Sequence, residues 1–117
     1  MTSDEAMHRI DGLLAHVWMV RTFIKHSEEA EEDDELQEIY RKLYDYMLAL
    51  GGPWKEQNAE AYLKQAQKKY SKFRQAAEQF AEVQPEVSDH TNFRMAAASL
   101  ATSVREIGEI LASRSAN

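Results

Sequence analysis

Apolar residues recur every three or four positions in four stretches of this chain, and three breaks separate these stretches. That spacing places apolar side chains on one face of a helix, and no stretch alternates apolar and polar residues as a half-buried strand does. We therefore predict four helices, over residues of about 3–27, 34–50, 56–83 and 88–112. Helices of this kind with short connections favour an all-α fold, an antiparallel up-down-up-down four-helix bundle forming one domain over residues 1–117.

The core should come from the apolar stripe of each helix. In the first helix the stripe is Ile10, Leu13, Val17, Val20, Phe23 and Ile24. In the second helix it is Leu36, Ile39, Tyr40, Leu43, Met47 and Leu50. In the third helix it is Ala59, Tyr62, Ala66, Tyr70, Phe73, Ala77 and Phe80. In the fourth helix it is Phe93, Ala97, Leu100, Val104, Ile107 and Leu111.

Capping residues indicate where the helices begin. Thr2 and Glu5 have the spacing of a capping box, so the first helix should begin just after Thr2. Asp33 or Asp34 is a good N-cap for the second helix, and Ser88 or Asp89 for the fourth, because their side-chain oxygens can accept from a free backbone N–H.

Helix breakers are scarce, since the chain has only 4 Gly and 2 Pro, so each cluster of them is a boundary signal. Gly51-Gly52-Pro53 should end the second helix, because glycine adopts the left-handed cap and proline cannot continue a helix. Gln84-Pro85 should separate the third helix from the fourth.

The charge of the chain is concentrated in one segment. The net charge is −6, and seven acids lie between Glu28 and Glu35, which leaves 13 acids against 14 bases elsewhere. Without a dominant basic face, nucleic acid and anionic membranes are not expected partners, because phosphate contacts need clustered Lys and Arg. The acidic N-terminus and the lack of a long apolar run indicate a cytoplasmic protein without an anchor.

The first candidate for chemistry is His16, which the predicted phase of the first helix places on the buried side. Antiparallel pairing sets it level with Tyr44 and Tyr46, either of which could supply a hydroxyl to the imidazole. Two roles are open: a hydrogen-bonded core histidine that fixes helix register, or a group that binds a ligand or handles a proton.

A metal site is the next possibility. Bundles hold metal pairs through Glu-x-x-His motifs on facing helices, and Glu5-Ala6-Met7-His8 is a single copy of that spacing. The predicted bundle also brings several ligand-type side chains to one end, namely His26, Glu29, Asp33, Glu86 and His90. This end could bind zinc or another divalent ion, or it could be solvated charge around loops. The chain has no Cys, so thiolate sites, disulfides and thiol nucleophiles are excluded.

The segment His8-Arg9-Ile10-Asp11-Gly12 resembles the His-x-x-Lys-Gly motif of histidine phosphotransfer domains, which are also four-helix bundles of about this length. The resemblance covers five residues and implies a phosphorylated imidazole at His8. This sequence has Asp11 where the family has Lys, and Lys is the residue that would favour a phosphorylated imidazole. We assign no family from it.

No other pattern indicates catalysis: the chain has no phosphate-binding Gly-rich loop and no nucleophile elbow. We therefore expect no enzyme and no cofactor. Lys64, Lys68 and Lys72 form a row opposite the aromatic stripe of the third helix. The row is either a solvated face or a docking site for an acidic surface.

Trp18 lies opposite the predicted core stripe of the first helix, with Leu14 and Met19 beside it, so this helix is apolar almost all round. Such a helix is either central in its own bundle or in contact with another chain. We predict a non-enzymatic binding or oligomerising module, with Leu14, Trp18 and Met19 in the contact of a homodimer or of another protein partner. The alternative is a bundle that binds a metal or small ligand at His16 or at the His26 and His90 end.

Overall fold

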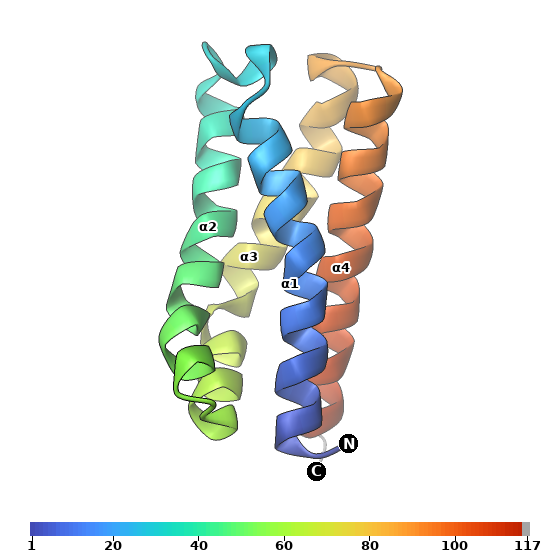
Figure 1. Cartoon of the computed structure of the whole chain (residues 1–117). Helices are drawn as coiled ribbons and strands as arrows, with labels where there is room; N and C mark the ends of the chain where they lie inside the picture. The colour runs from blue at the N-terminus through green and yellow to red at the C-terminus, as the bar shows by residue number, and fades with distance from the viewer. Residues whose placement is uncertain (116–117) are drawn as a thin grey trace.

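The computed structural model describes residues 1–115, and within them the chain forms helices and no strand. The elements are α1 (Ser3–Lys25), a short 3-10 helix η1 (Glu28–Ala30), α2 (Asp34–Lys55), α3 (Ala59–Val87) and α4 (Thr91–Ser115). Figure 1 shows the four α-helices side by side, each running opposite to the one before it. The predicted all-α, up-down-up-down four-helix bundle is confirmed.

Each helix occupies one corner of the bundle. α1 packs against α2 and α4, and α3 packs against the same two helices from the other side. The beginning of α1 and the end of α4 lie at one end of the molecule, where the Arg114 guanidinium donates to the Ser3 hydroxyl at 2.5 Å and to the Met1 carbonyl at 3.3 Å. The bundle measures 41 × 24 × 19 Å.

The core follows the predicted stripes of α2, α3 and α4 closely. Its largest fully buried side chains are Tyr62, Phe73 and Phe80 of α3, and Ile39, Leu43, Leu100 and Ile107 face them from the neighbouring helices. Tyr46 of α2 stacks flat on Phe73, with ring centroids 3.9 Å apart and planes 4° apart. Burying rings of this size supplies much of the hydrophobic stabilisation of a small bundle.

The phase of α1 differs from the prediction. Leu14 is buried, whereas Leu13 and Phe23 are only partly buried. The continuous buried line is Met7, Ile10, Leu14, Val17 and Ile24. Since α1 is apolar on several sides, either leucine could have faced the core, and packing between α2 and α4 selects Leu14.

The end of α2 was predicted wrongly. The helix continues through Gly51, Gly52 and Pro53 to Lys55, and no glycine of the described chain has a positive φ. The left-handed residue that ends it is Gln57, with φ 52°. The Gln57 N–H donates to the Trp54 carbonyl and the Asn58 N–H to the Pro53 carbonyl, both at 2.9 Å. This pair of bonds is a Schellman motif, which satisfies carbonyls that would otherwise be unpaired.

Both ends of α3 also differ from the predicted range of about 56–83. Asn58 is the N-cap, and its side-chain oxygen accepts from the Ala61 N–H at 3.1 Å. At the other end α3 continues past Pro85 to Val87, so the break predicted at Gln84-Pro85 is wrong. Proline lacks only its own N–H, and in the last turn of a helix the loss is small enough for packing to override.

Capping residues at the helix starts agree with the prediction at two of three places. The Thr2–Glu5 capping box is present, and the Asp33 carboxylate accepts from the Leu36 N–H at 3.0 Å. α4 begins later than predicted, at Thr91. Its first turn is capped by His90, whose Nδ1 lies 3.0 Å from the Asn92 N–H that donates to it, and not by Ser88 or Asp89.

Candidate functional site

The predicted site around His16 is not formed. His16 is exposed, because the rotation of α1 that buries Leu14 turns position 16 outward. Tyr46 is buried and donates its hydroxyl to the Ala66 carbonyl of α3 at 2.9 Å, on the side of α2 away from α1. Burial raises the pKa of this hydroxyl, so Tyr46 stays a neutral donor. Neither the structural nor the ligand-binding role predicted for a buried His16 holds.

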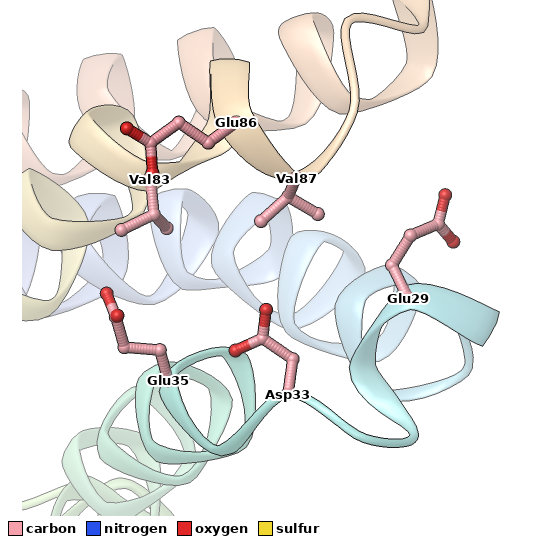
Figure 2. A pocket seen from close by; sticks show the side chains of 6 residues that line it. All are labelled: Glu29, Asp33, Glu35, Val83, Glu86 and Val87. Carbon is pink, nitrogen blue, oxygen red and sulfur yellow. The ribbon is translucent and has the colours of Figure 1, made fainter.

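The acidic end of the bundle gathers part of the predicted metal set. Figure 2 shows Glu29, Asp33 and Glu86 around one hollow, together with Glu35 and the apolar side chains of Val83 and Val87. His26 and His90 do not line this hollow. His90 caps α4 with its ring nitrogen, and His26 follows the last turn of α1.

Among residues 1–115, these carboxylates do not form a cluster with the geometry of a metal site. Within residues 1–115, no group of three or more His, Asp and Glu side chains is placed so that it could hold a metal ion. The Asp33 carboxylate already accepts from the Leu36 N–H, and the Glu35 carboxylate accepts from the Gln79 amide at 3.4 Å. The carboxylates of this end therefore act as separate caps and surface charges.

The His8–Gly12 segment lies in the first half of α1. His8 is exposed, its Nδ1 lies 2.7 Å from the Asp4 carbonyl, and its ring meets the edge of Trp54 at a centroid distance of 5.2 Å. Asp11 is partly buried. Burial raises the pKa of the Asp11 carboxyl, while the Tyr62 hydroxyl beneath it and the nearby His8 act in the opposite direction.

The feature that stands out on the surface is apolar. In the described chain, the exposed large hydrophobic side chains are Met1, Trp18, Met19, Tyr44, Leu48 and Met95. Four of them, Trp18, Met19, Tyr44 and Leu48, belong to the adjacent helices α1 and α2, which Figure 1 shows side by side. We call these four residues, with Ala15, the α1–α2 apolar patch.

The patch is held together by an arginine. Trp18 and Tyr44 face each other across the helices with ring centroids 6.4 Å apart. The Arg21 guanidinium lies 4.8 Å from the centroid of the Trp18 ring and 4.9 Å from that of the Tyr44 ring. Stacking against a cation in this way fixes both rings at little entropic cost. Trp18 nevertheless remains 44% exposed and Met19 67% exposed.

A shallow hollow adjoins the patch at Ala15. It has a volume of about 220 Å³ and is lined by Asp11, Leu14, Ala15, Met47, Leu50, Gly51 and Trp54. Apart from neighbouring residues of its own helix, no described residue has an atom within 4 Å of the position where a Cβ of Gly51 would lie, so the glycine leaves the wall of this hollow open. The hollow can accommodate an apolar side chain from a partner.

Part of the α1–α2 apolar patch was predicted from the sequence. Trp18 and Met19 are exposed as predicted for an interface, but Leu14 is buried in the bundle and can only line the wall of the hollow. The sequence predicts Tyr44 as a partner of His16, whereas in the structure its ring contacts Trp18. The sequence analysis does not place Leu48 in this surface. The signal for Leu48 was available, since it lies one turn after Tyr44 and off the core stripe of α2.

Comparison with known proteins finds no matching family model, no matching curated protein and no matching solved structure. Among the described helices, none has both the length and the apolar composition needed to cross a membrane.

Proposed function

We propose that this protein is a non-enzymatic helical module that associates with a second copy of itself through the α1–α2 apolar patch. The observation that carries the proposal is the exposure of Trp18, Met19, Tyr44 and Leu48 on two adjacent helices of a small bundle. Soluble monomers rarely leave large apolar side chains gathered in one place, and Trp and Tyr are enriched among the residues that supply interface energy.

The geometry of Trp18 favours a contact between proteins over a purely internal role. Arg21 and Tyr44 hold the indole ring in position, but they leave nearly half of its surface in water. A ring that is ordered before binding loses little side-chain entropy when a partner covers it, so more of the hydrophobic gain appears as affinity. The same holds for Tyr44, whose ring is ordered by the same guanidinium.

A twofold axis near Trp18 would bring α1 and α2 of one copy against α1 and α2 of the other. Each copy would then use the same residues, which is the arrangement of the commonest small oligomers. In such a contact Met19 or Leu48 of one copy can enter the hollow beside Ala15 of the other. Burying these side chains on both copies would remove the largest apolar cluster from water.

The test is the association state of Trp18→Glu. A carboxylate at this position would be desolvated against apolar side chains, so in about 500 mM NaCl, where contacts between charged surfaces are screened, we expect the variant to sediment as a monomer while keeping its helical circular dichroism. Met95→Glu is the matched control, because Met95 is 58% exposed on α4, outside the patch. If Trp18→Glu associates as strongly as the unmodified chain, the contact does not use this patch.

A further inference from the structure

The α2–α3 side of the bundle carries a groove lined with lysines. The groove has a volume of about 730 Å³, and the stacked rings of Tyr46 and Phe73 form part of its wall. Four lysines line it, with a single acid among them: Lys42, Lys68, Lys69, Lys72 and Asp45. We call this the lysine groove. Its local charge is strongly positive although the whole chain has a net charge of −6.

The lysines of α3 are not neutralised within their own chain. Among the described residues, the ion pairs join Lys42 to Glu38, Arg74 to Glu78 and Arg105 to Glu109. Lys68, Lys69 and Lys72 take part in none of them and are exposed. Their ammonium groups are therefore available for anions that approach from outside.

The other half of the same side has the opposite charge. The hollow in Figure 2 lies between the start of α2 and the end of α3, and its lining contains four carboxylates and no base: Glu29, Asp33, Glu35 and Glu86. Val83 and Val87 form an apolar strip between these acids. We call this the acidic hollow.

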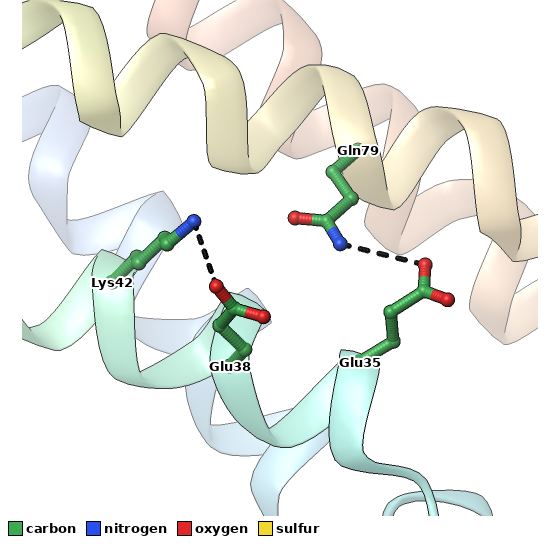
Figure 3. A network of polar contacts seen from close by, with 4 residues as sticks. All are labelled: Glu35, Glu38, Lys42 and Gln79. Atoms are coloured by element: carbon green, nitrogen blue, oxygen red, sulfur yellow. Dashed lines mark hydrogen bonds and ion pairs between the residues drawn. The ribbon is translucent and has the colours of Figure 1, made fainter.

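The acidic hollow and the lysine groove meet near Glu38 and Lys42 of α2, where an acid and a base neutralise each other. Figure 3 shows the two interactions at this boundary. On α2, the Lys42 ammonium group pairs with the Glu38 carboxylate, with 3.0 Å between the nitrogen and oxygen atoms. Glu35 lies one turn before Glu38, and its carboxylate accepts a hydrogen bond from the side-chain amide of Gln79 on α3. Along α2, Glu35 of the acidic hollow and Leu48 of the lysine groove are separated by roughly 20 Å at the rise of an α-helix. The α2–α3 side is thus acidic at one end, neutral in the middle and basic at the other.

We infer that this side is a second, self-complementary docking surface, on which the acidic hollow of one copy lies over the lysine groove of another. A twofold axis through the Glu38–Lys42 region, lying in the plane of the surface and crossing the helices at a right angle, places the acidic half over the basic half twice at once. A side of a bundle of 41 × 24 × 19 Å offers about the 800 Å² per partner that a stable interface buries. The inference does not depend on the contact between Trp18 and Tyr44 in the α1–α2 apolar patch, although Leu48 borders both surfaces.

A second copy is the occupant that the charges favour. The acids that match the lysine groove stand on the same surface, with Val83 and Val87 placed to contact the apolar part of the groove around Leu48 and Ala49. Charge complementarity of this kind sets orientation and speeds association more than it adds affinity. The contact should therefore weaken steeply as salt is added, unlike one made by the apolar patch.

The test uses the full chain carrying Trp18→Glu, so that the apolar patch is removed from the measurement. By sedimentation, we expect this variant to associate in about 20 mM NaCl, with a dissociation constant at least about tenfold higher in roughly 500 mM NaCl. A variant that stays monomeric at both salt concentrations would overturn the inference and leave the proposal for the apolar patch standing.

Charge swapping makes the test specific to this surface. In the same background, Lys68→Glu with Lys72→Glu gives the lysine groove a net negative charge, and Glu29→Lys with Glu86→Lys removes the net negative charge of the acidic hollow. We expect neither double variant to associate alone, and an equimolar mixture to form a heterodimer at low salt. Arg9→Glu with Arg105→Glu is the control, since it changes the net charge as much as the lysine pair does but lies on α1 and α4. The proposed docking surface is contradicted if the two double variants do not form a heterodimer when mixed. It is also contradicted if the Arg9→Glu with Arg105→Glu control dissociates as fully as the Lys68→Glu with Lys72→Glu variant.

Discussion

The Tyr70 hydroxyl occupies the space in which a side chain on Gly108 would have to lie. The hydroxyl donates to the Val104 carbonyl of α4 at 2.9 Å, one turn before Gly108. A Cβ built on Gly108 would be 2.8 Å from the Tyr70 Cζ atom and closer still to the hydroxyl oxygen. The close approach of α3 and α4 thus depends on a glycine inside a helix, where glycine is otherwise unfavourable.

We expect Gly108→Ala to destabilise the protein by about 1–2 kcal/mol, because displacing the Tyr70 ring costs more than the ~1 kcal/mol by which alanine improves a helix. Denaturant unfolding measures the difference. In a Tyr70→Ala background the same substitution should instead stabilise by about 0.5–1 kcal/mol. Gly12→Ala is the control and should stabilise the unmodified chain, since among the described residues only neighbours in its own helix come within 4 Å of its Cβ position. A destabilising Gly108→Ala in both backgrounds would point to a backbone clash instead.

Two buried tyrosines should respond differently to loss of their hydroxyl groups. Tyr46 donates to the Ala66 carbonyl, so Tyr46→Phe should cost about 1 kcal/mol, because a buried hydrogen bond between α2 and α3 is lost. Among the described residues the Tyr62 hydroxyl makes no hydrogen bond of ordinary length, although the Asp11 carboxyl is near it, so Tyr62→Phe should be neutral or slightly stabilising. Thermal unfolding of both variants checks this contrast. An equal loss at the two sites would mean that Tyr62 does bond to the Asp11 carboxyl beside it.

The Asp11 carboxyl should make stability depend on pH. Burial raises its pKa in the folded chain, and a carboxyl with a raised folded-state pKa stabilises the fold below its unfolded pKa of about 3.9. That contribution is lost as pH rises through the folded-state pKa. Asp11→Asn stays neutral, so it should unfold at a higher temperature than the unmodified chain at pH 7. The gap should close as pH falls below about 4, and a gap that widens toward acid would contradict the assigned direction.

The sequence was sufficient for the number, order and class of the helices, because the stripes of α2, α3 and α4 have one apolar side and one polar side. It was insufficient for the rotation of α1, where Leu13 and Leu14 are both apolar and Trp18 and Met19 lie off either stripe. An error of one position in that helix moved His16 from the expected core into solvent. The choice between the leucines is made by the side chains of α2 and α4, which a single-helix pattern does not contain.

The ends of the helices were hard to predict for a different reason. Gly51-Gly52-Pro53 reads as a stop signal, but all three residues remain helical, and the chain turns at Gln57, a residue with no special preference for positive φ. The gain there is collective, since one Schellman motif and the Asn58 cap let α2 and α3 connect through three residues. Local propensity could not reveal an advantage that depends on the packing of both helices.

The surface was predicted in outline only. Exposed Trp18 and Met19 followed from periodicity, whereas the pairing of Trp18 with Tyr44 through Arg21 depends on the register between α1 and α2. The lysine groove was predicted only as a row on α3, because Lys42 and Asp45 reach it from α2.

Self-association through the α1–α2 apolar patch is tested most directly by the molar mass of the unmodified chain in about 500 mM NaCl, where the contact between charged surfaces is screened. Light scattering during size-exclusion chromatography should give twice the mass of one chain at roughly 100 µM, with dissociation on dilution, as expected for a contact of micromolar affinity. A mass of one chain at every accessible concentration under these conditions would contradict the proposed function.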